Sequence, residues 1–488
     1  MAPAPPGATR RLTGIEARSI DFVPDSERRG KVSDQGPFWF LGNFHFFTIA
    51  IGFVGPSLHL SLGWTVVAGT AGILFGTLFQ AFHASQGAEL GLPQMIQSRA
   101  QFGYRGVVVP LIGALFTFVG FNVVDTILVA QGLNHLWGWD LHGVIVGLAV
   151  LAAALAVWGH DWLHLAFRTL FWLSLPLFAV LTAGIGLGLI HGVTAPAPAA
   201  AGFGWAAFAA QFAAAASYNI TYAPYVSDYS RYLPRSISRG AIIANVFAGA
   251  SLSAIWLICV GAWLASRMGA TDGLTSLAQA GNALLPHLGD GLVVCSVAAL
   301  LATMGMNAYS AMLSVVTGLD SLRQVRPTRR IRVVTILLLA VGWTWVSASA
   351  RGDAIETLSA TLVAMLYLLC PWTAVNLVDY FFLRKGRYAI VDLARPDGVY
   401  GAYGLRGLLG YFAGLAASAP FFVIPGVWTG PAAAALGGVD IAWLIGLGVA
   451  AAVYLLASLG FDPAREDAAI AASDAALSRP EPPGPHLT

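Results

Sequence analysis

Charged residues are scarce in this sequence. Only 10% of its 488 residues are Asp, Glu, Lys or Arg, whereas 57% are hydrophobic. A soluble globular protein carries about 25% charged residues. A chain of this length with so little charge cannot cover its own surface with polar groups, so we expect it to lie in a lipid bilayer. The net charge of +2 provides no basic surface, and we expect no nucleic-acid partner.

Cysteines and enzyme signatures are scarce as well. The three cysteines, Cys259, Cys295 and Cys370, lie in apolar runs, are too far apart for a zinc motif, and their odd number argues against a disulfide framework. The sequence contains no HExxH, GxSxG or Walker motif. We therefore expect no enzyme, no cofactor and no ATP-driven pump within this chain. Residues 1–35 have no apolar stretch typical of a signal peptide.

The sequence is instead rich in long apolar runs. A helix needs about 20 mostly apolar residues to cross the hydrocarbon core. The run 36–88 contains no charged residue and divides at Ser61–Gly63 into two spans. Ten further runs are 107–137, 141–159, 169–191, 204–227, 241–266, 289–319, 333–350, 357–382, 407–428 and 438–460. The sequence thus predicts an all-α, multi-pass membrane protein of about twelve transmembrane helices.

The basic residues indicate an orientation. Lys and Arg are enriched in cytoplasmic loops. If the N-terminal segment, residues 1–35, is cytoplasmic, then alternate loops and the tail place 24 of the 26 Lys and Arg residues on that side. Arg267 and Arg351 are the exceptions. We expect both termini in the cytoplasm, and a disordered tail over 461–488, which is rich in Ala, Pro and acidic residues.

Glycine and proline interrupt two of the spans at similar depths. The first contains Ala50–Pro56 (AIGFVGP), and the sixth contains Tyr222–Tyr225 (YAPY). Broken backbone survives at membrane depth only where protein or a water-filled cavity satisfies it. Breaks five helices apart predict a LeuT-type inverted repeat of five plus five helices, whose broken helices 1 and 6 form a binding site. The repeats would span 36–191 and 204–388, with helices 11 and 12 at 405–460. Ordinary proline kinks are the alternative.

Asp125 is the one acid well inside an uncharged span. A charged side chain at the bilayer centre is costly and usually functional. This carboxylate could bind a cation, carry a proton or accept hydrogen bonds from a ring N–H group, or it could be a structural acid held by a neighbouring hydroxyl. Phe121 lies one turn earlier on the same face. An aromatic side chain beside an acid suits a flat heterocycle.

Two further groups of polar residues lie in the spans. Helix 8 carries Asn307 on a stripe of small hydroxyl residues that includes Thr303, and the region before the second interruption carries Asn219 and Thr221. Amides need several hydrogen-bond partners, so both asparagines are candidate substrate ligands. The Thr303 hydroxyl is a candidate oxygen ligand for Na⁺. Close helix packing by small residues is the alternative for the hydroxyl stripe.

Three segments resemble the bacterial purine–cytosine permeases of the nucleobase:cation symporter-1 family. They are Ala223–Pro234 (APYVSDYSRYLP), Val375–Tyr388 (VNLVDYFFLRKGRY) and Ser98–Gly106 (SRAQFGYRG). The resemblance covers roughly residues 30–460 and runs in the family's order and spacing. It implies a LeuT-type fold with two extra helices and the import of cytosine, purines, allantoin or similar rings with Na⁺ or H⁺.

The resemblance also implies site residues. The family's helix 3 carries a Trp and, four residues later, a Gln that stack on and bind the base, and these positions fall on Phe121 and Asp125 here. Because Asp only accepts unless protonated, the substrate would be richer in N–H groups or cationic, or the coupling ion would be H⁺. The substrate set implied is Phe53, Phe121, Asp125, Asn219, Thr221 and Asn307. The cation set implied is Ala50, Phe53, Ala302 and Thr303.

Several alternatives stay open. A channel would need a continuous polar pore, and a receptor or an intramembrane enzyme would need a soluble domain or a catalytic cluster. A LeuT-fold carrier of an amine or amino acid is the remaining alternative, because the carboxylate of Asp125 favours a cationic solute. We expect a monomer in the bacterial plasma membrane, with the bilayer, a heterocyclic substrate and a coupling cation as its partners.

Overall fold

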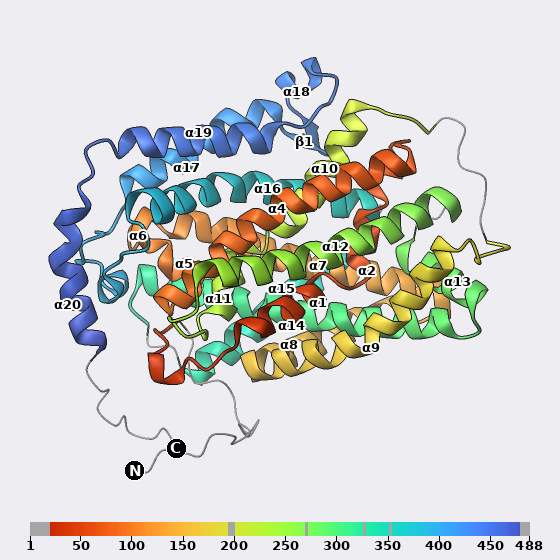
Figure 1. Ribbon diagram of the computed structural model, residues 1–488, viewed down its shortest axis with the longest axis horizontal. Helices are drawn as coiled ribbons and strands as arrows, with labels where there is room; N and C mark the ends of the chain where they lie inside the picture. The colour runs from red at the N-terminus through yellow and green to blue at the C-terminus, as the bar shows by residue number, and fades with distance from the viewer. Residues whose placement is uncertain (1–19, 194–200, 269–271, 326–327, 351–353, 479–488) are drawn as a thin grey trace, which may run out of the picture.

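The computed structural model describes residues 20–193, 201–268, 272–325, 328–350 and 354–478. Within them the chain is a bundle of helices that run roughly along one axis, with α13 at one end and α20 at the other (Figure 1). The first half contains α1 (Val32–Gly42), α2 (Phe46–Ile51), α3 (Val54–Ser57), α4 (Leu62–Leu90), α5 (Gln94–Gln97), α6 (Arg99–Phe102), α7 (Val108–Trp137), α8 (Leu141–Trp158) and α9 (His160–Gly186).

The second half repeats this order of a divided helix followed by long ones. It contains α10 (Trp205–Ile220), α11 (Ala223–Ser230), α12 (Arg239–Met268), α13 (Gly273–Leu284), α14 (Leu288–Leu322), α15 (Arg329–Ser349) and α16 (Ala354–Val378), which continues as a π-helical turn, η2 (Asp379–Leu383).

The C-terminal part adds shorter elements. These are α17 (Leu405–Ser418), α18 (Pro431–Ala435), α19 (Ala442–Ala457), α20 (Asp467–Leu477), a hairpin of β1 (Val423–Ile424) and β2 (Trp428–Thr429), and 3-10 turns η3 (Ile390–Ala394), η4 (Ala419–Phe421) and η5 (Pro463–Glu466). One more 3-10 turn, η1 (Asp25–Glu27), precedes α1. The hairpin pairs antiparallel, Val423 opposite Thr429.

The twelve predicted spans agree only in part with the helices of the structure. Within the described residues, eight helices are long and apolar enough to cross a membrane, and a ninth is the bent pair of α1 with α2–α3. The other three predicted spans coincide with α10–α11, α17 and α19. Each of these is too short, or is divided into segments that are too short, to cross a membrane as a single helix. The number twelve is therefore not settled. The fifth span also begins earlier than expected, at His160 rather than at residue 169.

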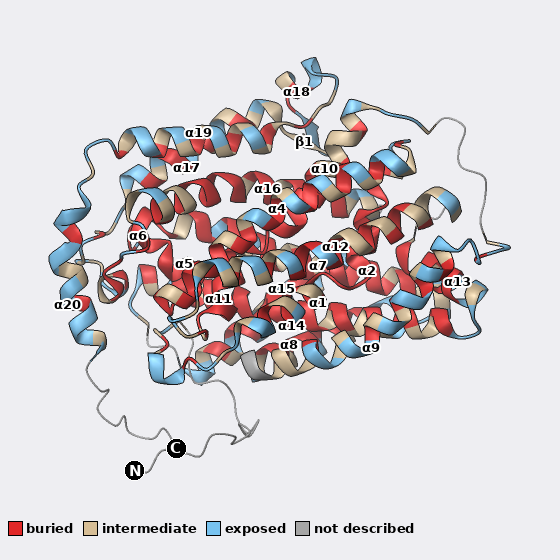
Figure 2. Cartoon of the chain, in the orientation of Figure 1, coloured by how far each residue is buried: buried red, intermediate tan, exposed pale blue. Residues whose placement is uncertain are grey.

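Burial separates inner from outer helices. Side chains of α7, α14 and α16 are mostly buried, whereas α8 and α9 expose large apolar residues such as Val150 and Trp172 on the outside (Figure 2). Exposed apolar side chains on spanning helices are expected where lipid replaces water. The inner helices are those that carry Phe121, Asp125 and Asn307.

Glycines bring the inner helices close together. A Cβ added at Gly76 of α4 would lie 2.2 Å from the carbonyl oxygen of Ala216 in α10, and one at Gly72 would lie 2.4 Å from that of Phe212. Small residues four apart allow two membrane helices to pack backbone to backbone. A larger side chain at either glycine would force α4 and α10 apart.

The C-terminal tail is ordered where we expected disorder, so that expectation was wrong for 463–477. Glu466 is buried and forms an ion pair with Arg384 at 2.8 Å, and Arg384 also pairs with Asp379. The backbone N–H of Val391 donates to the hydroxyl of Ser473. The tail is ordered because a buried arginine neutralises its acid and α20 covers an apolar cluster around η3. Residues 479–488 lie outside the described part.

The start of the described chain folds against the same end of the bundle. Arg28 is buried and donates to the carbonyl oxygens of Val23 and Ala88, each at 2.8 Å. Burial, and to a lesser degree the neighbouring Arg235, lowers the pKa of Arg28 to about 10. The start of the described chain and α20 therefore pack against the same apolar cluster. Arg10, Arg11 and Arg18 lie outside the described residues.

Candidate substrate site

Helix α1 breaks sharply before α2, and a milder interruption follows. The two segments α1 and α2–α3 meet at 58° across Asn43–His45, and a tightened turn at Gly52 and Phe53 then separates α2 from α3. The milder interruption lies within the predicted Ala50–Pro56, whereas the sharp bend, about two turns earlier, was not predicted. Pro56 is tolerated because it lies in the first turn of α3, where a helix does not need its N–H group.

Polar side chains take over the hydrogen bonds that this break removes. The hydroxyl of Thr48 donates to the carbonyl oxygen of Asn43 at 2.6 Å, and the ring nitrogen Nε2 of His45 lies 3.0 Å from that of Gly42. Tyr222, from α10–α11, donates to the same Gly42 oxygen at 2.7 Å. The first broken helix is thus held in part by the second.

The second interruption is milder. Thr221 and Tyr222 separate α10 from α11, yet both keep right-handed helical dihedrals. The N–H of Thr221 donates to the carbonyl oxygen of Ser217, as in an α-helix, and that of Tyr222 donates to Asn219, only three residues back. Its position agrees with the prediction, but the backbone here is a helical turn and not an unwound segment. Pro224 removes one N–H group here and sits in the first turn of α11.

A cluster of aromatic rings lies where the two interrupted helices meet α7. Phe121 stacks on Tyr222 with ring centroids 6.2 Å apart and planes at 18°, and Phe47 meets Phe121 edge-on at 5.6 Å. Tyr218 stacks on Phe47 at 5.4 Å. Edge-on and offset-stacked rings at these separations attract one another. Flat aromatic faces of this kind can stack on a planar molecule, and we call the contact between Phe121 and Tyr222 the slot.

Asp125 lies beside this cluster, one turn from Phe121. It is 1% exposed and lies close enough to Tyr218, Tyr222 and Tyr225 to interact electrostatically with their hydroxyl groups. Among the residues that the structure describes, no side chain or backbone group hydrogen-bonds to its carboxylate. A buried carboxylate without a partner is costly. The structural interpretation, in which a hydroxyl holds Asp125, therefore has no support in this geometry.

Asn307 is connected to the same place through a chain of amides. Its Nδ2 group donates to Oδ1 of Asn122 at 3.1 Å, and its Oδ1 accepts from the hydroxyl of Tyr225 at 3.3 Å. Asn122 in turn donates to the carbonyl oxygen of Met304. The amide of Asn307 thus links α14, α7 and α11 around the aromatic cluster.

Asn219 and Thr221 point elsewhere. Asn219 donates to Thr77 of α4 at 2.6 Å and accepts from Asn43 at 2.9 Å, while Thr221 donates back to the carbonyl oxygen of Tyr218. These bonds join α10 to α4 and to the end of α1, and none of them reaches Phe121, Asp125 or Asn307.

The predicted cation ligands lie on neighbouring helices, since α2 packs against α14. The carbonyl oxygen of Ala50 accepts from Phe53, that of Phe53 accepts from Ser57, and the hydroxyl of Thr303 donates to Ala299 at 3.3 Å. Ala302 beside it is buried. A carbonyl oxygen has a second lone pair, so these bonds leave each of the two carbonyls able to ligate a cation.

Sequence reasoning missed a row of tyrosines along α10 and α11, of which Tyr218 and Tyr222 belong to the aromatic cluster. Tyr218, Tyr222, Tyr225 and Tyr229 recur every three or four residues and are all buried. This spacing places them on one helix face, which was a visible signal. The proline in Tyr222–Tyr225 predicts a break in the helix, whereas the helical face continues through residues 221 and 222.

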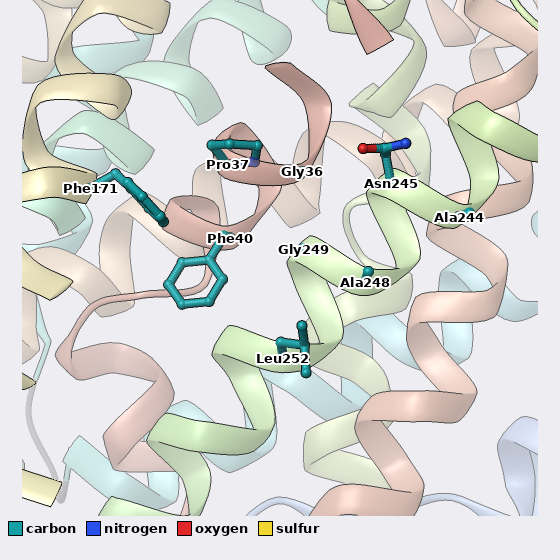
Figure 3. Close-up of a pocket in the computed structure, with 9 residues that line it drawn as sticks. All are labelled: Gly36, Pro37, Phe40, Phe171, Ala244, Asn245, Ala248, Gly249 and Leu252. Carbon is teal, nitrogen blue, oxygen red and sulfur yellow. The ribbon is translucent and has the colours of Figure 1, made fainter. Parts of the chain in front are cut away.

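A groove of about 430 Å³ lies apart from this cluster, on the outside of the bundle. It runs between α1, α9 and α12, where Phe40, Phe171 and Leu252 line it beside the amide of Asn245 (Figure 3). Leu252 is 63% exposed, so the groove opens toward lipid. Neither Phe121 nor Asp125 lines this groove.

Residues 22–446 match the family of permeases for cytosine/purines, uracil, thiamine and allantoin. The chain belongs to this family. A putative purine–cytosine permease of Bacillus subtilis is 33% identical over 447 residues, which is 90% of this permease and 95% of that protein. A purine–cytosine permease of Saccharomyces cerevisiae is 27% identical and covers 53% of this chain and 49% of its own.

Solved structures show the same fold. Mhp1, a nucleobase-cation-symport-1 family transporter in a closed conformation with bromovinylhydantoin bound, matches with a TM-score of 0.69 at 18% identity, over 91% of this chain and 95% of its own. Its inward-facing conformation matches with a TM-score of 0.65 over 96% and 99%. The expected LeuT-type fold is confirmed. The permease is a secondary transporter and a multi-pass membrane protein, and the family does not favour an enzyme or an amine carrier.

Proposed function

We propose that this permease imports a nucleobase or a related planar heterocycle, such as cytosine, a purine or allantoin, and binds it between α7 and the interrupted helices. One observation carries the proposal: the carboxylate of Asp125 is buried without a partner beside stacked aromatic rings. A ring with several N–H groups would supply the hydrogen bonds that this carboxylate lacks. The heterocycles for which the family is described are rings of this kind.

Substrate entry requires the aromatic slot to widen. A planar guest in contact with two rings needs their planes about 7–8 Å apart, twice the carbon–carbon contact distance. The centroids of Phe121 and Tyr222 are 6.2 Å apart, which sets the upper limit on the distance between their planes. The conformation described here is therefore closed at the slot, and α10–α11 must move relative to α7 by about 1 Å or more to admit substrate.

Coupling to a cation would drive the transport. We assign Na⁺ or H⁺ as the coupling ion, with the carbonyl groups of Ala50 and Phe53 and the hydroxyl of Thr303 as ligands if it is Na⁺. Oxygen ligands of this kind suit hard cations. A cation that binds one conformation better shifts the population toward it, and the bundle containing α1 and α10 would then alternate between the two sides of the membrane.

The permease would act as a monomer in the bacterial plasma membrane, with both termini in the cytoplasm. The supporting observation is that 24 of the 26 Lys and Arg residues fall on one side of the predicted topology. Labelling of single cysteines placed in α20 and in α13 from outside the cell tests the orientation. Only the α13 position should react, and reaction at α20 would contradict it.

Competition uptake tests the substrate class. Cells that express the permease take up labelled cytosine, adenine, uracil or allantoin, and an amine panel competes. We expect at least one heterocycle to be taken up and the amines not to compete. Uptake of an amine with no heterocycle competing would overturn the proposal. Replacing Na⁺ by choline at two pH values identifies the ion, since uptake will depend on Na⁺ or on the pH gradient.

A further inference from the structure

A second groove lies on the outside of the bundle, between the end of α7, the start of α8 and the first half of α14. Its volume is about 610 Å³. Its floor is formed by the buried residues Leu133 and Leu148, and its rim by Leu151 and Val294, which are 53% and 57% exposed. A long apolar groove open to the side of a membrane helix fits a hydrocarbon chain.

One end of this groove carries a different chemistry. Trp137 and Trp139 lie with ring centroids 5.3 Å apart and planes at 49°, and they are 38% and 52% exposed. Asp140 follows them and lines the groove. Its Oδ2 atom accepts from the backbone N–H of Gly143 as the N-cap of α8. Exposed tryptophans at the end of a spanning helix mark the membrane–water interface.

A second acid, Asp290, lies near the groove but does not line it. Asp290 is in the first turn of α14 and is 44% exposed at its side chain. It is one turn before Val294 and two turns before Val297, both of which line the groove, so it shares their face. It pairs with His287 at 3.2 Å. The residues that line the groove thus combine two indole rings with the carboxylate of Asp140 and include no Lys, Arg or His.

We propose that this groove binds a phospholipid with an ammonium headgroup, such as phosphatidylethanolamine. The acyl chain would lie over Leu133 and Leu148, and the ammonium group would lie against the indole rings and the carboxylate of Asp140. A cation over an indole face is attracted by the ring, and a carboxylate adds charge complementarity. A headgroup with a net negative charge and no ammonium group would only be repelled by the carboxylate of Asp140. The site lies in the outer leaflet under the proposed topology and does not depend on which substrate is carried.

Two substitutions separate the headgroup from the chain. Asp140→Asn removes the charge but keeps a side chain that caps a helix equally well. Gly147 lines the groove, and a Cβ added there would meet no atom within 4 Å, so Gly147→Leu fills the groove without a clash. Matched controls are Asp272→Asn, which alters the N-cap of α13, and Gly342→Leu, at a similarly open glycine of α15.

Native mass spectrometry of the purified full-length permease tests the proposal. The protein is titrated with phosphatidylethanolamine or phosphatidylglycerol of the same acyl chains, and the retained lipid is counted. We expect wild type and both controls to retain more phosphatidylethanolamine, Asp140→Asn to lose about two- to fivefold of that preference, and Gly147→Leu to retain less of both lipids. Equal retention of the two lipids by wild type, a preference that survives Asp140→Asn, or unchanged retention by Gly147→Leu would each overturn it.

Discussion

The two interrupted helices differ in what holds them. The junction of α1 with α2 bends by 58° and contains neither glycine nor proline between Asn43 and His45. The junction of α10 with α11 stays helical although it carries Pro224. Side chains that can replace backbone hydrogen bonds, and not residues that remove them, mark the sharp break. Proline and glycine at a helix's first turn are compatible with a continuing helix.

This difference bears on how substrate enters. The sharp break is fixed by bonds from Thr48 and His45, whereas the mild interruption carries the tyrosines that face Phe121 and Asp125. Because the rings of Phe121 and Tyr222 are in contact, with centroids 6.2 Å apart, they must separate before a planar guest fits between them. We therefore expect α10–α11 to move relative to α7 when the slot opens, while the α1–α2 bend is kept.

Asn43→Leu should have the largest effect on stability. Asn43 donates to Oδ1 of Asn219 and to the carbonyl oxygen of Ala250. The change leaves the buried Oδ1 of Asn219 unpaired at the sharp break, whereas the Ala250 oxygen still accepts from the hydroxyl of Ser253. We expect a loss of about 1–3 kcal/mol of stability, measured as a lower melting temperature of the purified protein. The control Asn245→Leu should change little, because Asn245 bonds only within its own helix and lines the outer groove (Figure 3). Equal effects would contradict the assignment.

Thr48→Val should cost less, about 1 kcal/mol. It removes the hydroxyl that bonds to Asn43 and lies 2.8 Å from the hydroxyl of Tyr218, and it keeps the side-chain shape. The same melting experiment measures it. Thr117→Val is the control, since this buried hydroxyl bonds only one turn back in α7. A control that melts as low as Thr48→Val would show that the bend does not need this hydroxyl.

Tyr222→Phe should have an effect of about 0.5–1 kcal/mol on stability. The change removes the bond from the mild interruption to Gly42 at the sharp break and leaves the ring against Phe121. Because the change removes the hydrogen bond between the two junctions, we also expect the substrate affinity to change, although the ring at position 222 still stacks on Phe121. A substrate titration of the purified protein checks this, and an unchanged affinity and melting temperature would indicate that the two junctions are independent.

Pro224→Ala should have the smallest effect, below about 1 kcal/mol. The first turn of α11 accommodates proline without strain, so alanine restores an N–H group there without removing any packing that the bend requires. Pro56→Ala in α3 should behave alike. If either change lowered the melting temperature more than Asn43→Leu, proline would be the residue that sets the break, as the sequence first suggested.

Most of the fold followed from the sequence, because apolar length alone predicts spanning helices. The boundaries of α7 and α8 agree with prediction within one residue. The interruption between α2 and α3 lies within the predicted Ala50–Pro56. The sharp bend at Asn43–His45 did not follow, since Thr48 and His45 replace backbone bonds only once the chain has turned. The order of α20 did not follow either, because it depends on the distant Arg384.

The candidate site, like the fold, could be predicted from the sequence only in part. Phe121 and Asp125 share one helix face, and helical spacing is sufficient to predict their proximity. Asn219 depends on partners from α4 and α1, and no pattern within α10 reveals those. The direction of an amide in a bundle is set by what neighbouring helices offer it, which a single sequence does not contain.

Uptake by Asp125→Asn, at matched expression and melting temperature, tests the central claim most directly. The substrate is the heterocycle that wild type takes up best, and Thr126→Val is the control, because that hydroxyl bonds only to its own helix. If Asp125 accepts hydrogen bonds from the ring, or carries the coupling proton, uptake falls by about 10- to 100-fold while the control retains it. Wild-type uptake by Asp125→Asn would contradict the account.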